Sequence, residues 1–191
     1  LAGEKFIDSF LLDKLKNSPN MKKHGLAVGF AMVALYDYFE QKGQNPQMTK
    51  EDWEVVGILH DADYEITNKS LELHTEETTK KLKEANVDQT IINAIRGHCD
   101  KEPRTTLMAK SVYAVDELTG LIVAAALVQP DKKLRSVTVD SVLRKLKDKY
   151  FAASVNRDQI KTCEAELGIP LEEFVTLTLK SMQGKSNELV L

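Results

Sequence analysis

Apolar residues in this chain recur every three or four positions, and no run of strand length alternates between apolar and polar residues. This spacing is typical of α-helices with one buried face, whereas a half-buried strand needs strict alternation. Val28, Ala31 and Leu35, for example, fall on one stripe. The pattern predicts helices over residues 24–43, 49–60, 74–85, 88–98, 105–128, 139–153 and 170–182. We therefore expect an all-α fold, a helical bundle.

Local start and stop signals support several of these helices. Thr49 begins the sequence TKED, in which Asp52 can reach back to form a capping box. Asp88 is a candidate N-cap for the fourth helix, and Pro170 suits the first turn of the last one. Gly43 ends the first helix.

Length and composition predict one domain and exclude some classes of partner. The chain has 191 residues, 42% of them hydrophobic and 6% aromatic, which suits a single domain spanning residues 1–191. We expect its core over about residues 22–182 and a frayed tail at 184–191. The best apolar run, Leu121–Val128, is far too short to span a bilayer. Two cysteines outside any CxxC pair favour a reduced, cytoplasmic chain, and a net charge of −3 argues against a nucleic-acid partner.

All four histidines and one aspartate fall where a core is expected. His24, His60, His98 and Asp116 share helix faces with apolar residues, and His74 lies at the start of its helix. Burying an unpaired carboxylate is costly, and these faces carry no lysine or arginine to pair with it. Imidazoles and carboxylates are ligands of divalent metals. A single such histidine is more often a core or boundary residue, so the joint pattern carries the prediction of a metal site.

The order His24, His60-Asp61, His74, His98, Asp116 resembles the HD-domain superfamily of metal-dependent phosphohydrolases. The stretches GILHDADYE and VDELTGLIVA are similar to those of its small stand-alone bacterial members. The resemblance covers about residues 22–182 and implies an all-α fold with the site at the centre of the bundle. It implies that His24, His60, Asp61 and Asp116 bind one metal ion. It further implies that His74 and His98 hold a second ion, with Asp61 bridging both.

The same resemblance implies a hydrolase with one or two divalent ions (Mn, Ni, Mg, Zn or Fe) that activate a water. The expected substrate is a small phosphate ester, with nucleotides among the candidates. Asp61 is the expected central catalytic residue. Asp63 and Glu65 are candidates for positioning water or protonating a leaving group, although an indirect or surface role is the commoner one for such residues. Tyr64 stands where one family variant has a catalytic glutamate, so that role does not transfer.

Basic residues outside the motif are candidate phosphate ligands. They are Lys101 and Arg104 after His98, and Lys132 and Lys133 after the fifth helix. A solvated charge is the commoner role for each. Cys99, next to His98, is expected to pack elsewhere, because neighbouring residues on a helix diverge by about 100°.

Two other functions are compatible with the same residues. The set resembles that of the di-iron oxygenases of the superfamily, which would contain two irons and consume oxygen. A non-catalytic, nucleotide-binding regulatory module would bind a nucleotide tightly without turnover. Metal identity and a substrate panel discriminate among the three.

Overall fold

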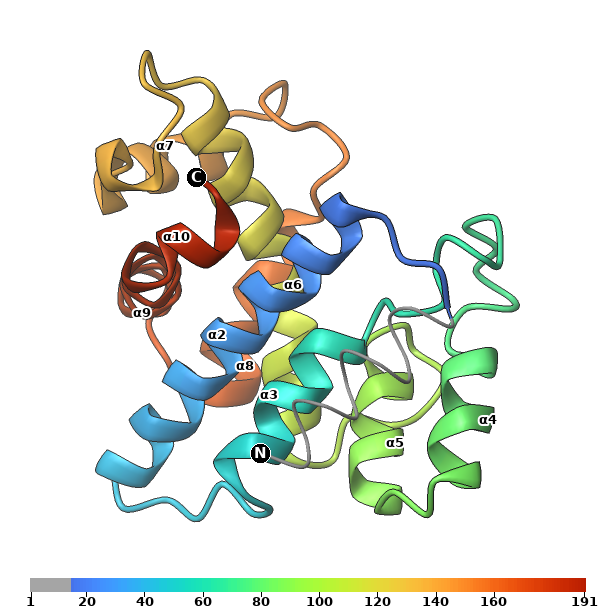
Figure 1. Cartoon of the computed structure of the whole chain (residues 1–191). Coiled ribbons are helices and arrows are strands. Elements are labelled where there is room, and N and C mark those ends of the chain that lie inside the picture. The colour runs from blue at the N-terminus through green and yellow to red at the C-terminus, as the bar shows by residue number, and fades with distance from the viewer. Residues whose placement is uncertain (1–14) are drawn as a thin grey trace.

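The computed structural model describes residues 15–191, which form nine α-helices and one 3-10 helix without any strand (Figure 1). The prediction of an all-α fold is confirmed. The part of the predicted domain before residue 15 lies outside the described residues. The elements are α2 (Pro19–Gln41), α3 (Lys50–Leu59), α4 (Glu76–Glu84), α5 (Gln89–Gly97), α6 (Leu107–Leu127), η2 (Leu134–Ser136), α7 (Val139–Lys147), α8 (Arg157–Leu167), α9 (Leu171–Gly184) and α10 (Ser186–Leu189).

Two long helices, α2 and α6, cross in the middle of the molecule (Figure 1). Both contribute fully buried side chains, such as Leu35 from α2 and Leu118 from α6, to the hydrophobic core. Helix α3 packs on α2 and helix α8 on α6. Helices α4 and α5 lie on the other side of this pair from α7, α9 and α10. Among residues 15–191, no helix has the length and apolar character needed to cross a membrane.

Glycines bring the backbones of α2 and α3 into contact. A Cβ atom at Gly57 would lie 2.6 Å from the backbone nitrogen of Gly29. A Cβ at Gly25 would lie 2.6 Å from the carbonyl oxygen of Ile58. Only hydrogen fits in either place, so the two helices pack unusually closely. This contact sets His24, which precedes Gly25, against His60 at the end of α3.

The N-caps expected at Thr49 and Asp88 are both present. Thr49 and Asp52 form the capping box of α3, and the Asp88 side chain accepts the backbone N–H of Thr90. Helix α7, however, ends at Lys147 and not near residue 153. The following loop is held by the Arg157 guanidinium, which donates to backbone carbonyls at Asp148, Ala152 and Val155 over 2.7–3.0 Å. Those carbonyls are therefore bonded to a side chain and not to a continued helix.

Two segments differ from the sequence-based expectation. Helix α8 was not predicted; its N-cap is Asn156, whose side chain accepts the N–H groups of Asp158 and Gln159 at 3.2 Å each. The tail, expected to fray, contains α10, in which Leu189 is buried. In both cases packing against long helices (α6 for α8, α2 and α9 for α10) stabilises a segment with weak local signals.

Candidate metal centre

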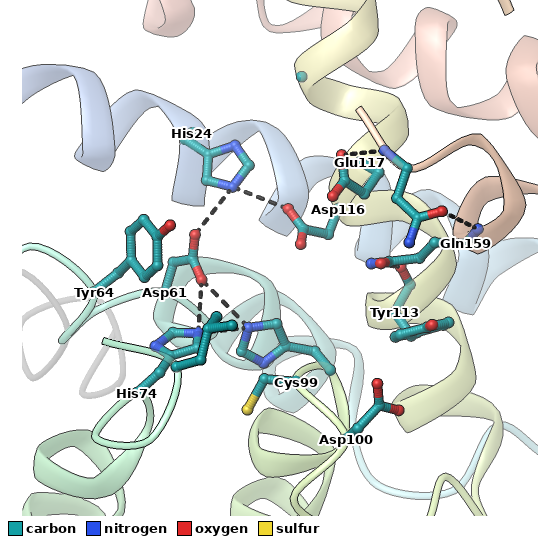
Figure 2. Close-up of a pocket in the computed structure, with 14 residues that line it drawn as sticks. His24, Asp61, Tyr64, His74, Cys99, Asp100, Tyr113, Asp116, Glu117 and Gln159 are labelled. Atoms are coloured by element: carbon teal, nitrogen blue, oxygen red, sulfur yellow. Dashed lines mark hydrogen bonds and ion pairs between the residues drawn. The ribbon is translucent and has the colours of Figure 1, made fainter. Parts of the chain in front are cut away.

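Side chains from five separate segments converge at one end of a pocket (Figure 2). Figure 2 shows His24, Asp61, His74 and Asp116 directed toward one another. The complete set is His24 from α2, His60 and Asp61 from the end of α3, His74 from the turn before α4, His98 from the end of α5, and Asp116 from α6. The fold thus brings together all six residues that the sequence proposes as metal ligands.

The first donor group consists of His24, His60 and Asp116. The Nε2 atom of His24 lies 3.2 Å from Nε2 of His60 and 3.1 Å from Oδ1 of Asp116. The Nε2 atom of His60 lies 3.3 Å from the same carboxylate oxygen. His60 is completely buried, whereas His24 and Asp116 keep about a quarter and a fifth of their side chains exposed. The group is therefore open on the side of the pocket.

The second donor group consists of His74, His98 and Asp61. The Nε2 atoms of the two histidines lie 3.0 Å apart. Oδ1 of Asp61 lies 3.1 Å from Nε2 of His74 and 3.3 Å from Nε2 of His98. The other oxygen, Oδ2, faces the first group, at 3.6 Å from His24 and 3.7 Å from His60. Asp61 therefore turns one carboxylate oxygen toward each group.

Hydrogen bonds at the far side of three of the four rings indicate which nitrogen carries the proton. Nδ1 of His60 donates to the carbonyl of Gly57 at 2.7 Å, and Nδ1 of His98 donates to the carbonyl of Ile95. Nδ1 of His74 donates to Oδ1 of Asp63 at 3.1 Å. A neutral imidazole carries one proton, so in the neutral form of these three rings each Nε2 atom presents a bare lone pair. Lone pairs that face each other at such short range are suited to sharing a cation.

The donors fit a divalent metal in both groups. Ligands of one ion bound at about 2.0–2.2 Å are separated by roughly 3.0–3.6 Å. The short contacts within the two groups, 3.0–3.3 Å, fall in that range. Imidazole and carboxylate ligands suit Zn, Mn, Ni and Fe, and do not select among them.

The carboxylates give the centre a negative potential. Burial alone would lower the pKa of His60, but the carboxylates of Asp61 and Asp116 raise it to about 9. Burial likewise opposes ionisation of Asp61, yet the neighbouring imidazoles, His60 foremost, hold its pKa well below the usual range. The centre therefore stabilises positive charge on or between its imidazoles.

Asp63 and Glu65, the two candidate acids after the doublet, face away from the pocket. Asp63 is completely buried and accepts Nδ1–H of His74 together with the backbone N–H groups of Thr75 and Thr78, at 2.8–3.1 Å. Glu65 accepts the backbone N–H of Ser18 at 2.6 Å. Neither lines the pocket at the donor groups. The structure thus places Asp63 behind His74 and Glu65 at the start of α2.

The four candidate phosphate ligands do not line the pocket either. The Lys101 ammonium donates to the carbonyls of Glu72 and His74 and to Glu76, at 2.5–2.8 Å. The Arg104 guanidinium bonds the carbonyl of Gly97 at 3.1 Å and the Asp100 carboxylate, and stacks 3.7 Å from the Tyr113 ring centroid. The third and fourth candidates, Lys132 and Lys133, lie in the exposed turn before η2.

The pocket beside the donors has a volume of about 440 Å³, and its lining also includes residues that the sequence does not point to. Cys99 is among them, with its Sγ within 4.8 Å of donors on His74 and His98. The expectation that it packs elsewhere assumed a continuing helix, but α5 ends at Gly97. The polar lining is completed by Tyr64, Asp100, Tyr113, Glu117, Asn156 and Gln159. The tyrosines, Asp100 and Glu117 lie within three residues of a motif residue, Asn156 offers only cap chemistry, and Gln159 has no sequence signal.

Comparison with known proteins agrees with this geometry. The family model of the HD domain matches residues 22–121, a range that contains all six donors. Searches of curated proteins and of solved structures gave no match. The match covers more than half of the chain, and the helices within it position the six donors as described above. This chain belongs to the HD-domain family.

Proposed function

We propose that the protein is a metal-dependent phosphohydrolase that acts on a small phosphate ester, with nucleotides among the candidate substrates. The observation that carries the proposal is the position of Asp61. Its two oxygens face two separate groups of imidazoles, which is the arrangement needed to share one carboxylate between two cations. An HD-domain chain with such a donor set is suited to hydrolysis at phosphorus.

Two divalent ions would be held by the six donors. His24, His60 and Asp116 would hold one, His74 and His98 the other, and Asp61 would be shared. When bound, such ions lower the pKa of a coordinated water and neutralise charge on phosphoryl oxygens.

The chain itself supplies orientation and access. The carbonyls of Gly57 and Ile95 and the Asp63 carboxylate keep the three Nε2 lone pairs directed inward. His60, His74 and His98 are buried, and Asp61, Asp116 and His24 face the pocket, so the pocket gives water and substrate access to the donors. A phosphate ester would therefore enter with its phosphoryl group toward Asp61 and its remaining part in the pocket.

Metal analysis of protein purified without chelator, followed by a phosphatase panel, tests the proposal. We expect about two divalent ions per chain and hydrolysis of phosphomonoesters with Mn, Ni, Mg or Zn. Two irons with oxygen uptake would support the di-iron oxygenase instead. Tight nucleotide binding without turnover on any ester would support a regulatory module.

Asp61→Ala is the decisive variant. It removes both facing oxygens, and we expect turnover to fall by more than about 100-fold. Mutation of a residue that only hydrogen-bonds a metal ligand already lowers metal affinity or activity by about 10–100-fold. Asp140→Ala, at an exposed aspartate in the first turn of α7, is the matched control and should keep metal content and turnover. Full turnover in Asp61→Ala would refute the proposal.

A further inference from the structure

Part of the pocket wall beyond the donors comes from two helices. Tyr113 and Glu117 project from α6, and Gln159 from the start of α8 (Figure 2). Asn156, the N-cap of α8, also lines the pocket. Helix α8 begins at residue 157, well beyond residue 121, where the family match ends. This part of the wall is therefore contributed by a segment outside the matched domain.

Three side chains of this wall each use one polar atom in a hydrogen bond within the protein and keep a second polar atom available. Nε2 of Gln159 donates to the carbonyl of Tyr113 at 2.8 Å, which leaves its Oε1 as an acceptor. Oδ1 of Asn156 caps α8 at 3.2 Å, which leaves its Nδ2 as a donor. Glu117 accepts the backbone N–H of Asn156 through Oε2 at 3.1 Å, which leaves Oε1. Within residues 15–191, no hydrogen bond is made by these three remaining atoms. The wall thus offers a donor, an amide acceptor and a carboxylate oxygen.

The charged side chains that line the pocket outside the donor groups are all acidic. In the described part of the chain no lysine or arginine lines it, and the nearby cations Lys101 and Arg104 are bonded elsewhere. Apart from the donors, its lining carries two carboxylates. Asp100 is paired with Arg104, whereas no lysine or arginine among residues 15–191 forms an ion pair with Glu117. A ligand anion placed away from the donors would meet no counter-charge and one facing carboxylate, which is an unfavourable interaction.

We propose that Asn156, Gln159 and Glu117 form a recognition wall that selects phosphomonoesters with an uncharged, hydroxyl-bearing body and rejects esters with a second anionic group. The proposal rests on the function proposed above and names its substrate class. The donor and acceptors would bind hydroxyl groups of the body, and the facing carboxylate would exclude a second phosphate or a carboxylate. The pocket volume lies within the range of about 300–1,000 Å³ common for small-molecule sites.

Three probe esters of six carbons separate the recognition of hydroxyl groups from the exclusion of a second anionic group. Glucose 6-phosphate has an uncharged, hydroxylated body, 6-phosphogluconate carries a carboxylate at its far end, and n-hexyl phosphate has no hydroxyl group. We expect the metal-loaded protein to bind and hydrolyse glucose 6-phosphate at least about tenfold better than either of the others. Affinity is measured by isothermal titration calorimetry and kcat/KM by phosphate release. Equal affinity for all three esters overturns the proposal.

Variants of the wall test the assigned residues. Gln159→Met removes the acceptor at similar size, and Asn156→Ser removes the amide donor while keeping an N-cap. Both variants should weaken the binding of glucose 6-phosphate about tenfold and leave the binding of n-hexyl phosphate unchanged. Glu117→Gln should raise affinity for 6-phosphogluconate about tenfold. Gln89→Met, at an exposed glutamine of α5, is the control and should change none of these values.

Metal content of each variant serves as the check on folding, since none of the four replaces a metal ligand. Wild-type selectivity in both Gln159→Met and Glu117→Gln overturns the proposal. If the affinity ranking and its response to the variants hold without any turnover, the recognition wall is supported and the hydrolase is refuted. If esters are hydrolysed without that ranking, the hydrolase stands and the wall does not.

Discussion

Gly57→Ala should separate α2 from α3 and thereby weaken the metal centre. The new Cβ would lie 2.6 Å from both Cα and N of Gly29 and 2.8 Å from the carbonyl carbon of Val28. All three are backbone atoms, so no side-chain rotation relieves the overlap. The helices must move apart by close to 1 Å to restore ordinary contact distances.

The cost of this change can be estimated from two opposing effects. Overpacking a well-packed interior costs about 1–3 kcal/mol, and a clash with backbone belongs at the upper end. The better helix propensity of alanine returns about 1 kcal/mol. We expect a net loss of about 2 kcal/mol in the free energy of unfolding, or roughly 4–8 °C in Tm for a domain of this size.

The same movement should be visible in metal binding. His24 and His60 sit on the two helices that separate, and their Nε2 atoms are now 3.2 Å apart. Widening that gap should lower the metal affinity of the first donor group by about tenfold or more. Even the loss of a residue that only hydrogen-bonds a metal ligand typically lowers metal affinity by about 10–100-fold. Urea unfolding of chelated protein measures the first effect, and a competitive metal titration measures the second.

Gly184→Ala is the matched control. A Cβ there meets nothing within 4 Å, so we expect unchanged metal affinity and a gain of about 0.4–1 kcal/mol in stability. If Gly57→Ala is as stable as the wild type and binds metal equally well, the backbone contact does not position the centre and the reasoning is refuted.

Three further outcomes follow from the site and the core. Asp63→Asn leaves one oxygen to accept three N–H donors, so the free energy of unfolding in urea should fall by about 2–3 kcal/mol. Metal content should drop toward one ion per chain, because His74 loses the partner that orients it. Two bound ions would contradict the role given to Asp63. Removing metal with a chelator should lower Tm, since an ion at 100 times its Kd stabilises by about 2.7 kcal/mol per site, and an unchanged Tm would mean that the native protein binds none. Burial raises the pKa of Cys163 to about 12, so its thiol should resist alkylation at pH 8 until the chain unfolds, as mass spectrometry can show.

Local signals determine most of the helices. The capping box of Thr49 and Asp52, the cap at Asp88 and the helical spacing of apolar residues in α2 and α6 all act within a few residues of the chain. For the same reason, helix ends were less well predicted. Helix α7 stops early because Arg157, ten residues beyond its end, bonds the carbonyls of the following loop.

The sequence by itself determined the fold class and proposed the six donors, because a buried histidine or aspartate is rare enough to stand out on an apolar face. Tertiary structure alone decided what each charged group beyond the donors contacts. Asp63 holds His74 from behind, Lys101 and Arg104 bond backbone and acids near them, and α8 carries Gln159 to the pocket. Hydrogen-bond partners and pocket walls depend on contacts between segments far apart in the chain, and such contacts leave no periodic trace in a single sequence.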